Sequence, residues 1–85
     1  MEIRYAVSFG RDYKDLPQEM RMLLVKKFAL LLNNMRHPSL RTKKMEGHEG
    51  IWEARITKGY RFTFQKEIYG YLLRRVGPHD ILRNP

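Results

Sequence analysis

The last third of the chain places charged side chains where one face of a sheet would collect them. Glu53 and Arg55 lie two residues apart in an alternating run at 52–57. Arg61 holds the matching position in the next alternating run. Residues i and i+2 of a strand face the same side, so we expect the three side chains on one polar face. Guanidinium groups bind phosphate oxygens in pairs and stay charged, so such a face is suited to phosphate groups.

The same residues also have purely structural explanations. Arg61 could be an exposed arginine on a solvated strand. Glu53 could be a general base whose pKa is tuned by its arginine neighbours, or half of an ordinary surface ion pair worth about 0 to 1 kcal/mol. Both interpretations of Glu53 stay open at this point.

His79 is the second candidate for chemistry, in the segment 77–80 that follows the last apolar run. Histidine is the side chain best suited to proton transfer near neutral pH. In such a turn it is also commonly held by a backbone group or by a neighbouring carboxylate such as Asp80, which could equally orient a working histidine. His37, His48 and His79 are too scattered along the sequence to indicate a metal site, and cysteine is absent. We therefore expect neither metal nor cofactor.

The composition adds a strong positive charge. Seventeen Lys and Arg residues stand against nine Asp and Glu, which gives a formal net charge of +8. Such a chain attracts polyanions: nucleic acid, an anionic membrane or an acidic protein segment. Lys43 and Lys44 precede the strands, and Arg75 shares the strand parity of His79, so all three are suited to contact the phosphate backbone of a nucleic acid. A solvated basic surface is the plainer alternative.

Hydrophobic periodicity indicates the elements that position these residues. Alternation over residues 3–9 predicts a first strand, and helical spacing over 9–16 predicts a short helix. Pro17 suits the first turn of a second, longer helix, whose apolar stripe covers 20–35. This helix should end before Pro38, because the residue preceding a proline is pushed out of the helical region.

The second half of the chain predicts a basic loop and then a sheet. Residues 39–50 lack periodicity and contain two glycines, so we expect a loop. Alternation at 52–57 and 60–65 predicts a hairpin, and the apolar run 68–76 predicts a central strand. We therefore expect an α+β fold, with an N-terminal strand and two helices, short then long, packed on one face of a four-stranded, mainly antiparallel sheet. The opposite face would be free to carry polar residues.

The length of the chain suits one domain over residues 1–85 and is too small for two. Its first residues lack the apolar segment of a signal peptide, and two lysines interrupt the longest apolar stretch. We therefore expect a cytosolic protein without a membrane partner.

Several segments, taken together, resemble the RelE/ParE superfamily of toxins over nearly the whole chain. They are Trp52-Glu53-Ala54-Arg55-Ile56, the hairpin return Gly59-Tyr60-Arg61-Phe62 and the late segment Val76-Gly77-Pro78-His79-Asp80. None is specific alone, whereas their combination and spacing in a small basic chain are. The resemblance implies the toxin of a type II toxin-antitoxin system.

RelE-type toxins cleave mRNA in the ribosomal A site without metal, by attack of the RNA 2′-hydroxyl on the neighbouring phosphate. The resemblance therefore implies a ribosome-dependent endoribonuclease. It assigns phosphate binding and transition-state stabilisation to Arg61 with Arg55, and the general acid to His79. YoeB-like members use a glutamate as general base, and strongly basic members carry two lysines at the positions of Glu53 and Arg55, so this chain matches neither pattern fully.

The resemblance also implies partners: the ribosome, its mRNA and a cognate acidic antitoxin similar to RelB. Given the net charge of +8, we expect this antitoxin to be an acidic, largely disordered segment that folds on the chain. One position departs from the family. A tyrosine often follows the His-Asp pair, whereas residues 81–83 here are Ile-Leu-Arg, so Tyr60 or Tyr69 would have to supply the ring.

Two other functions remain open. One is a ParE-like inhibitor of DNA gyrase with the same fold and no nuclease activity, and the other is an RNA-binding module without chemistry. Convergence of Arg55, Arg61 and His79 on one face would favour the nuclease, because fold alone does not determine function.

Overall fold

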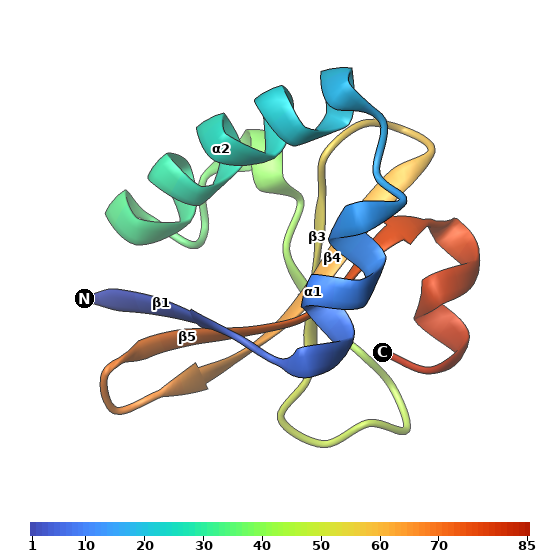
Figure 1. The fold of residues 1–85 in the computed structure, drawn as a ribbon. Helices are drawn as coiled ribbons and strands as arrows, with labels where there is room; N and C mark the ends of the chain where they lie inside the picture. The colour runs from blue at the N-terminus through green and yellow to red at the C-terminus, as the bar shows by residue number, and fades with distance from the viewer.

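Five strands form one mixed sheet in the computed structural model, which describes all residues 1–85 (Figure 1). The elements in chain order are β1 (Glu2–Tyr5), α1 (Val7–Lys14), α2 (Gln18–Asn33), the 3₁₀ helix η1 (Pro38–Leu40), β2 (Lys43–Lys44), β3 (Trp52–Arg55), β4 (Tyr60–Glu67), β5 (Gly70–Pro78) and the 3₁₀ helix η2 (His79–Arg83). The strand order is β1-β5-β4-β3-β2. Only the β1–β5 pair is parallel, so the α+β fold with a mainly antiparallel sheet is confirmed.

The core lies between α2 and one face of the sheet. Phe62 and Phe64 of β4 are fully buried there, because alternation directs every second residue of the strand to this face. Phe28 of α2 meets Phe62 edge to face, with ring centroids 5.8 Å apart. Phe9 of α1 lies 6.2 Å from Phe28, so α1 extends the same helical layer toward β1.

The strand count of four is wrong, because β2 adds a fifth strand at the edge. Lys43 pairs with Glu53 and Lys44 pairs with Trp52 across an antiparallel ladder. The range 39–50 was expected to be a loop, and most of it is. A strand of two residues is too short to show alternation of apolar and polar residues, so β2 is defined only by its pairing with β3.

The first strand is shorter than the alternation over residues 3–9 indicates. β1 ends at Tyr5, and the Ala6 N–H makes the last backbone bond to β5, donating to the Leu73 carbonyl at 2.9 Å. From Val7 the chain is helical, and Phe9 reaches the core from α1 instead of from a strand. Over so short a range, apolar residues at every second position are compatible with a strand and with the start of a helix.

β5 is an internal strand, flanked by β1 and β4, while β4 occupies the central position. Its pairing with β4 shifts register between Thr63 and Phe64, so Arg74 is an extra residue in the ladder. The parity expected for this strand fails at that bulge. Regular alternation from Arg75 would put Arg74 on the core side, whereas Arg74 donates to Gln65 Oε1 at 2.7 Å.

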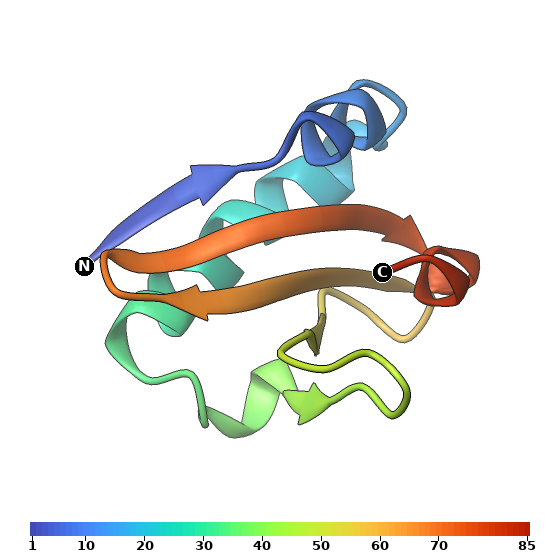
Figure 2. The same cartoon turned by 90° about the horizontal axis from the view of Figure 1, so that it is seen from below.

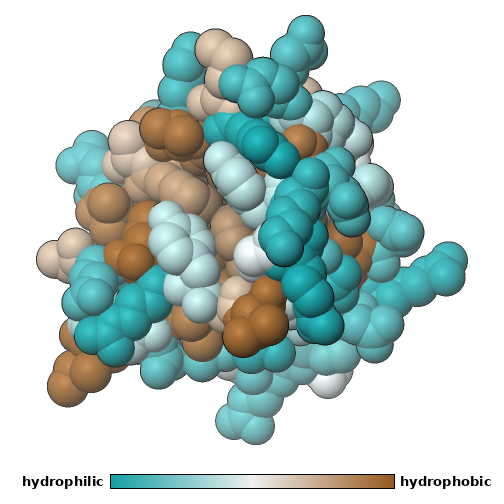
Figure 3. All heavy atoms as spheres, viewed as in Figure 1, coloured by the Kyte–Doolittle hydropathy of each residue, from teal (hydrophilic) through white to brown (hydrophobic).

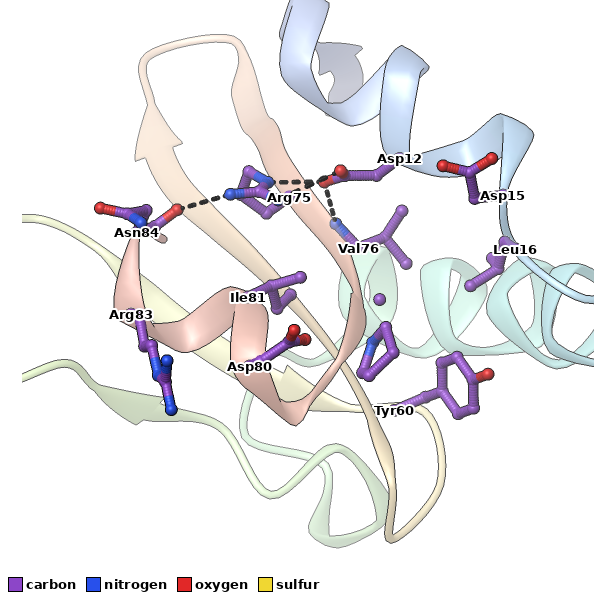
Figure 4. Close-up of a pocket in the computed structure, with 12 residues that line it drawn as sticks. Asp12, Asp15, Leu16, Tyr60, Arg75, Val76, Asp80, Ile81, Arg83 and Asn84 are labelled. Carbon is purple, nitrogen blue, oxygen red and sulfur yellow. Dashed lines mark hydrogen bonds and ion pairs between the residues drawn. The ribbon is translucent and has the colours of Figure 1, made fainter.

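Side chains of α1 complete the edge of β5 where β1 has ended. Ser8 Oγ donates to the Arg74 carbonyl at 2.6 Å. The Asp12 carboxylate accepts from the Val76 backbone N–H at 3.1 Å and from Arg75 Nε at 2.6 Å. Figure 4 shows Arg75 held between Asp12 and the Asn84 carbonyl, so one side chain joins α1, β5 and the C-terminal segment.

The polar face of the sheet is only partly free, contrary to expectation. In Figure 2, α2 lies behind the β4–β5 ladder and the C-terminal segment lies in front of it. Gly77 shares the polar face with Arg61, and a Cβ on this glycine would lie 3.0 Å from the Ile81 side chain. Ile81 is buried. η2 therefore covers the β5 end of this face and leaves the β3 side open.

None of the helices has the length and apolar character needed to cross a membrane.

Replacing Asp12 by alanine should lower the free energy of unfolding by about 1 to 3 kcal/mol, because the Val76 N–H and Arg75 lose their acceptor. Asp12→Asn should lose less, since its amide oxygen can still accept from Val76. Urea unfolding followed by the fluorescence of Trp52, the single tryptophan, measures both. Asp15→Ala is the matched control, because this exposed carboxylate makes no side-chain hydrogen bond. Equal stability of the Asp12 and Asp15 variants would contradict the role given to this edge.

Candidate functional site

Three of the four residues expected to take part in catalysis meet in one cavity on the open part of the polar face, together with Lys43. Arg55 and Arg61 face each other across the β3–β4 ladder, and Glu53 lies one pair further along it. With Arg41 and Lys43 they line a cavity of about 280 Å³, here called the cationic pocket. It combines four cationic side chains with one carboxylate, so its net charge suits an anion.

Arg61 is held in place by the turn that precedes it. Its Nη1 donates to the carbonyl oxygens of Thr57 and Lys58, both at 2.6 Å, and of Tyr60 at 3.2 Å. Its Nε lies 3.9 Å from Glu53 Oε1, with both side chains largely buried. Arg61 thus closes the β3–β4 turn with one nitrogen and faces the cationic pocket with the rest of its guanidinium.

Arg55 has unused hydrogen-bonding capacity. Its Nε is buried and has no hydrogen-bond partner. Burial, and then the positive charges of Arg41 and Arg61, lower the pKa of Arg55 from its ordinary value. A buried donor without a partner is costly, and here it lies among like charges. An anion in the cationic pocket would give this donor a partner and offset the neighbouring positive charges.

Arg41 was not predicted as a site residue. It follows η1 with φ 48° and ψ 46°, and it is the one residue other than glycine with a positive φ. This left-handed conformation costs an L-residue roughly 1 to 2 kcal/mol. Its charge in a basic segment was visible in the sequence, but nothing there indicated the backbone conformation that brings it beside Arg55.

His79 lies near the cationic pocket but does not line it. It begins η2 and is exposed, and it makes no hydrogen bond or ion pair with Asp80. Gly77 pairs with Arg61, and His79 follows Gly77 by two residues. His79 therefore lies about 6 to 7 Å along the chain from the residue that pairs with Arg61. Of the three residues expected to converge, Arg55 and Arg61 therefore lie in the pocket, and His79 lies at its β5 side.

Lys44 and Arg75 lie elsewhere. Lys44 is on the opposite face of β2 from Lys43, with its Nζ 5.5 Å from the Trp52 ring centroid. Arg75 lines a second cavity of about 510 Å³, shared with Tyr60 and Asp80 (Figure 4). Its hydrogen bond to Asp12 raises the pKa of Arg75.

The two tyrosines considered in place of the late family tyrosine differ in position. Tyr60 pairs with Pro78 at the end of β5 that carries His79. Tyr69 lies in the β4–β5 turn at the other end of β5, where the Arg4 guanidinium stacks 4.0 Å above its ring. Only Tyr60 is near enough to His79 to act with it.

An apolar groove separates α1 and β1 from α2. Its cavity measures about 550 Å³ and is lined mainly by aromatic and aliphatic side chains, namely Tyr5, Phe9, Tyr13, Leu24, Val25 and Phe28, with Gly10 and Arg21. Val25 is 64% exposed. Figure 3 shows hydrophobic surface gathered on the side of α2 and β1, while the opposite side of the view is hydrophilic.

Comparison with known proteins identifies the fold. No protein-family model and no curated protein matches the chain. Among solved structures, YafQ from E. coli strain BL21(DE3) is 19% identical, with a TM-score of 0.79 over 95% of this chain and 96% of that one. A chain of the RelB-RelE antitoxin-toxin complex from Methanococcus jannaschii is 20% identical, with a TM-score of 0.67 over 95% of each chain. The intact E. coli RelBE toxin-antitoxin complex matches at 19% identity and a TM-score of 0.70, over 89% of this chain and 93% of that one. The chain has the fold of these toxins, as the resemblance implied.

Proposed function

We propose that the chain is the toxin of a type II toxin-antitoxin system and cleaves mRNA on the ribosome without metal. The observation that carries the proposal is the convergence of Arg55, Arg61 and Glu53 in the cationic pocket. When a 2′-hydroxyl attacks a phosphodiester, a carboxylate can accept the hydroxyl proton and two arginines can stabilise the charge on the phosphate. The shared fold with RelE and YafQ supports the same conclusion.

The reaction assigns one task to each side chain. Glu53 accepts the proton of the 2′-hydroxyl as its oxygen bonds to phosphorus. Arg55 and Arg61 bind the non-bridging oxygens, on which negative charge accumulates. The bond from phosphorus to the 5′-oxygen then breaks, which leaves a cyclic phosphate on one fragment and a 5′-hydroxyl on the other.

His79 donates the proton that the departing 5′-oxygen takes up. Its exposed position at the β5 side of the pocket leaves it free to approach a substrate that spans from β3 to β5. Tyr60 is the aromatic side chain next to this position. Lys43 lines the cationic pocket and Arg75 lines the neighbouring cavity, where they would contact further phosphates or ribosomal RNA. Lys44 lies on the Trp52 side, away from this path.

The proposal predicts cuts in a translated message. Purified protein added to a cytosolic translation extract should produce breaks that primer extension maps to codons in the ribosomal A site. Arg55→Ala should lower the single-turnover rate by about 10² or more, the scale for losing one transition-state donor. Arg61→Ala should do the same, but it also removes the bonds that close the β3–β4 turn.

Two variants separate these effects. Arg61→Lys keeps the charge without the planar fork, and Lys44→Ala removes a cation outside the pocket. A Lys44→Ala protein should cut at the normal rate. Absence of cuts with the unaltered protein, combined with inhibition of DNA supercoiling by gyrase, would instead establish the ParE-like function. Binding of RNA without either effect would establish a non-catalytic module.

The role of His79 has its own test. His79→Gln should bind ribosomes with unchanged affinity, because the side chain is exposed and outside the pocket, while the cleavage step slows. Sedimentation with programmed ribosomes measures the binding, and rapid quenching measures the rate. If binding and rate fall together, His79 contacts RNA and does not supply the proton.

An antitoxin is the second proposed partner, and the apolar groove is the surface that suits it. The solved relatives include RelB-RelE and DinJ-YafQ toxin-antitoxin complexes. An amphipathic helix could bury its apolar stripe between α1 and α2. Its acidic residues would then meet the surrounding charge of a chain with net charge +8.

Charge and groove should affect the two rate constants of antitoxin binding differently. Stopped-flow mixing with the acidic protein encoded beside this chain should show slower association at high salt and little change in dissociation. Val25→Asp should instead accelerate dissociation, since it places a charge in the groove. Ile68→Asp is the control, because Ile68 is fully exposed at the β4–β5 turn. A salt-independent association rate would rule out electrostatic capture, and equal dissociation of the two variants would rule out the groove.

A further inference from the structure

The backbone at Arg41 is held in an unfavourable conformation by its neighbours. Leu40, before it, is completely buried. Thr42, after it, donates its hydroxyl to the Met35 carbonyl at 2.9 Å, and the Arg41 N–H donates to the Pro38 carbonyl at 3.2 Å. Glycine or asparagine is usual where a helical turn ends in the left-handed region. An arginine here is the kind of local strain that accompanies function.

The conformation brings the Arg41 side chain to the cationic pocket. It lines the cavity with Arg55 and Arg61, and its charge acts on Arg55. Its guanidinium makes no hydrogen bond or ion pair with the protein, and it is exposed. All five of its N–H donors are therefore available to a ligand.

The other arginines of the pocket need this help to hold an anion. Arg61 uses Nη1 for three carbonyl oxygens and directs Nε toward Glu53. Arg55 offers a buried Nε without a partner. An anion bound between Arg55 and Arg41 would satisfy that donor and relieve the repulsion between the two guanidinium groups.

We propose that Arg41 and Arg55 form a two-arginine clamp for a phosphate of the single-stranded RNA backbone, with Arg61 closing the pocket beside it. The RNA part rests on the proposed function. The clamp itself depends only on the geometry of the pocket. Arg41 acts by binding the phosphate directly, and its left-handed backbone is the feature that directs it there.

The test measures binding in the absence of ribosomes, so it does not depend on cleavage. Inorganic phosphate and a short oligouridylate are titrated into ¹⁵N-labelled protein while the Nε–Hε resonances of the arginines are followed. Phosphate should shift the resonances of Arg55 and Arg41. Arg41→Gly should raise both dissociation constants about tenfold, the scale for losing one charge-assisted contact. Arg41→Lys should recover part of the affinity.

Folding does not confound this variant, because glycine tolerates the positive φ, so Arg41→Gly should melt at an equal or higher temperature. Arg36→Ala is the matched control, since it removes one arginine that lies on the Trp52 side. Unchanged phosphate affinity in Arg41→Gly overturns the clamp. A loss for phosphate alone, with oligouridylate unaffected, overturns the assignment to RNA. A protein that shows the expected binding and cuts no message refutes the nuclease and leaves the clamp standing.

Discussion

The unpaired edge of β5 is the constraint on which the arrangement depends. β5 runs over nine residues, and β1 pairs with only its first four. Buried backbone donors and acceptors need partners, so the rest of that edge has to be satisfied in another way. Ser8 and Asp12 of α1 supply these partners. This requirement fixes α1 against β5 and, through Arg75, fixes the C-terminal segment on the other face.

Much of this fold is predictable because its main elements have a clear period. Apolar and polar residues alternate along β3 and β4, so alternation placed Ala54, Phe62 and Phe64 in the core. The remaining features depend on contacts between distant parts of the chain. The pairing of β2, the bulge at Arg74 and the pair Asp12–Arg75 leave no local signal, because each is defined by a partner elsewhere.

The candidate site divides in the same way. Strand parity alone brought Glu53, Arg55 and Arg61 together, since all three lie in regular strands without a bulge. Parity also put Arg75 on this face, but its bond to Asp12 of α1 and the place of His79 at the start of η2 depend on elements that parity does not describe. The positive φ of Arg41 brings its side chain to the cationic pocket. Residue type does not predict a positive φ for arginine.

The parallel pairing of β1 with β5 joins the two ends of the chain, and this has a consequence for biosynthesis. β1 and both helices leave the ribosome before the strands that cover them, so a nascent chain exposes the apolar sides of α1 and α2 until β4 and β5 follow. The cationic pocket is also incomplete until β4 supplies Arg61. Because the sheet is closed by β5, neither the helical layer nor the cationic pocket is complete before the last strands are synthesised.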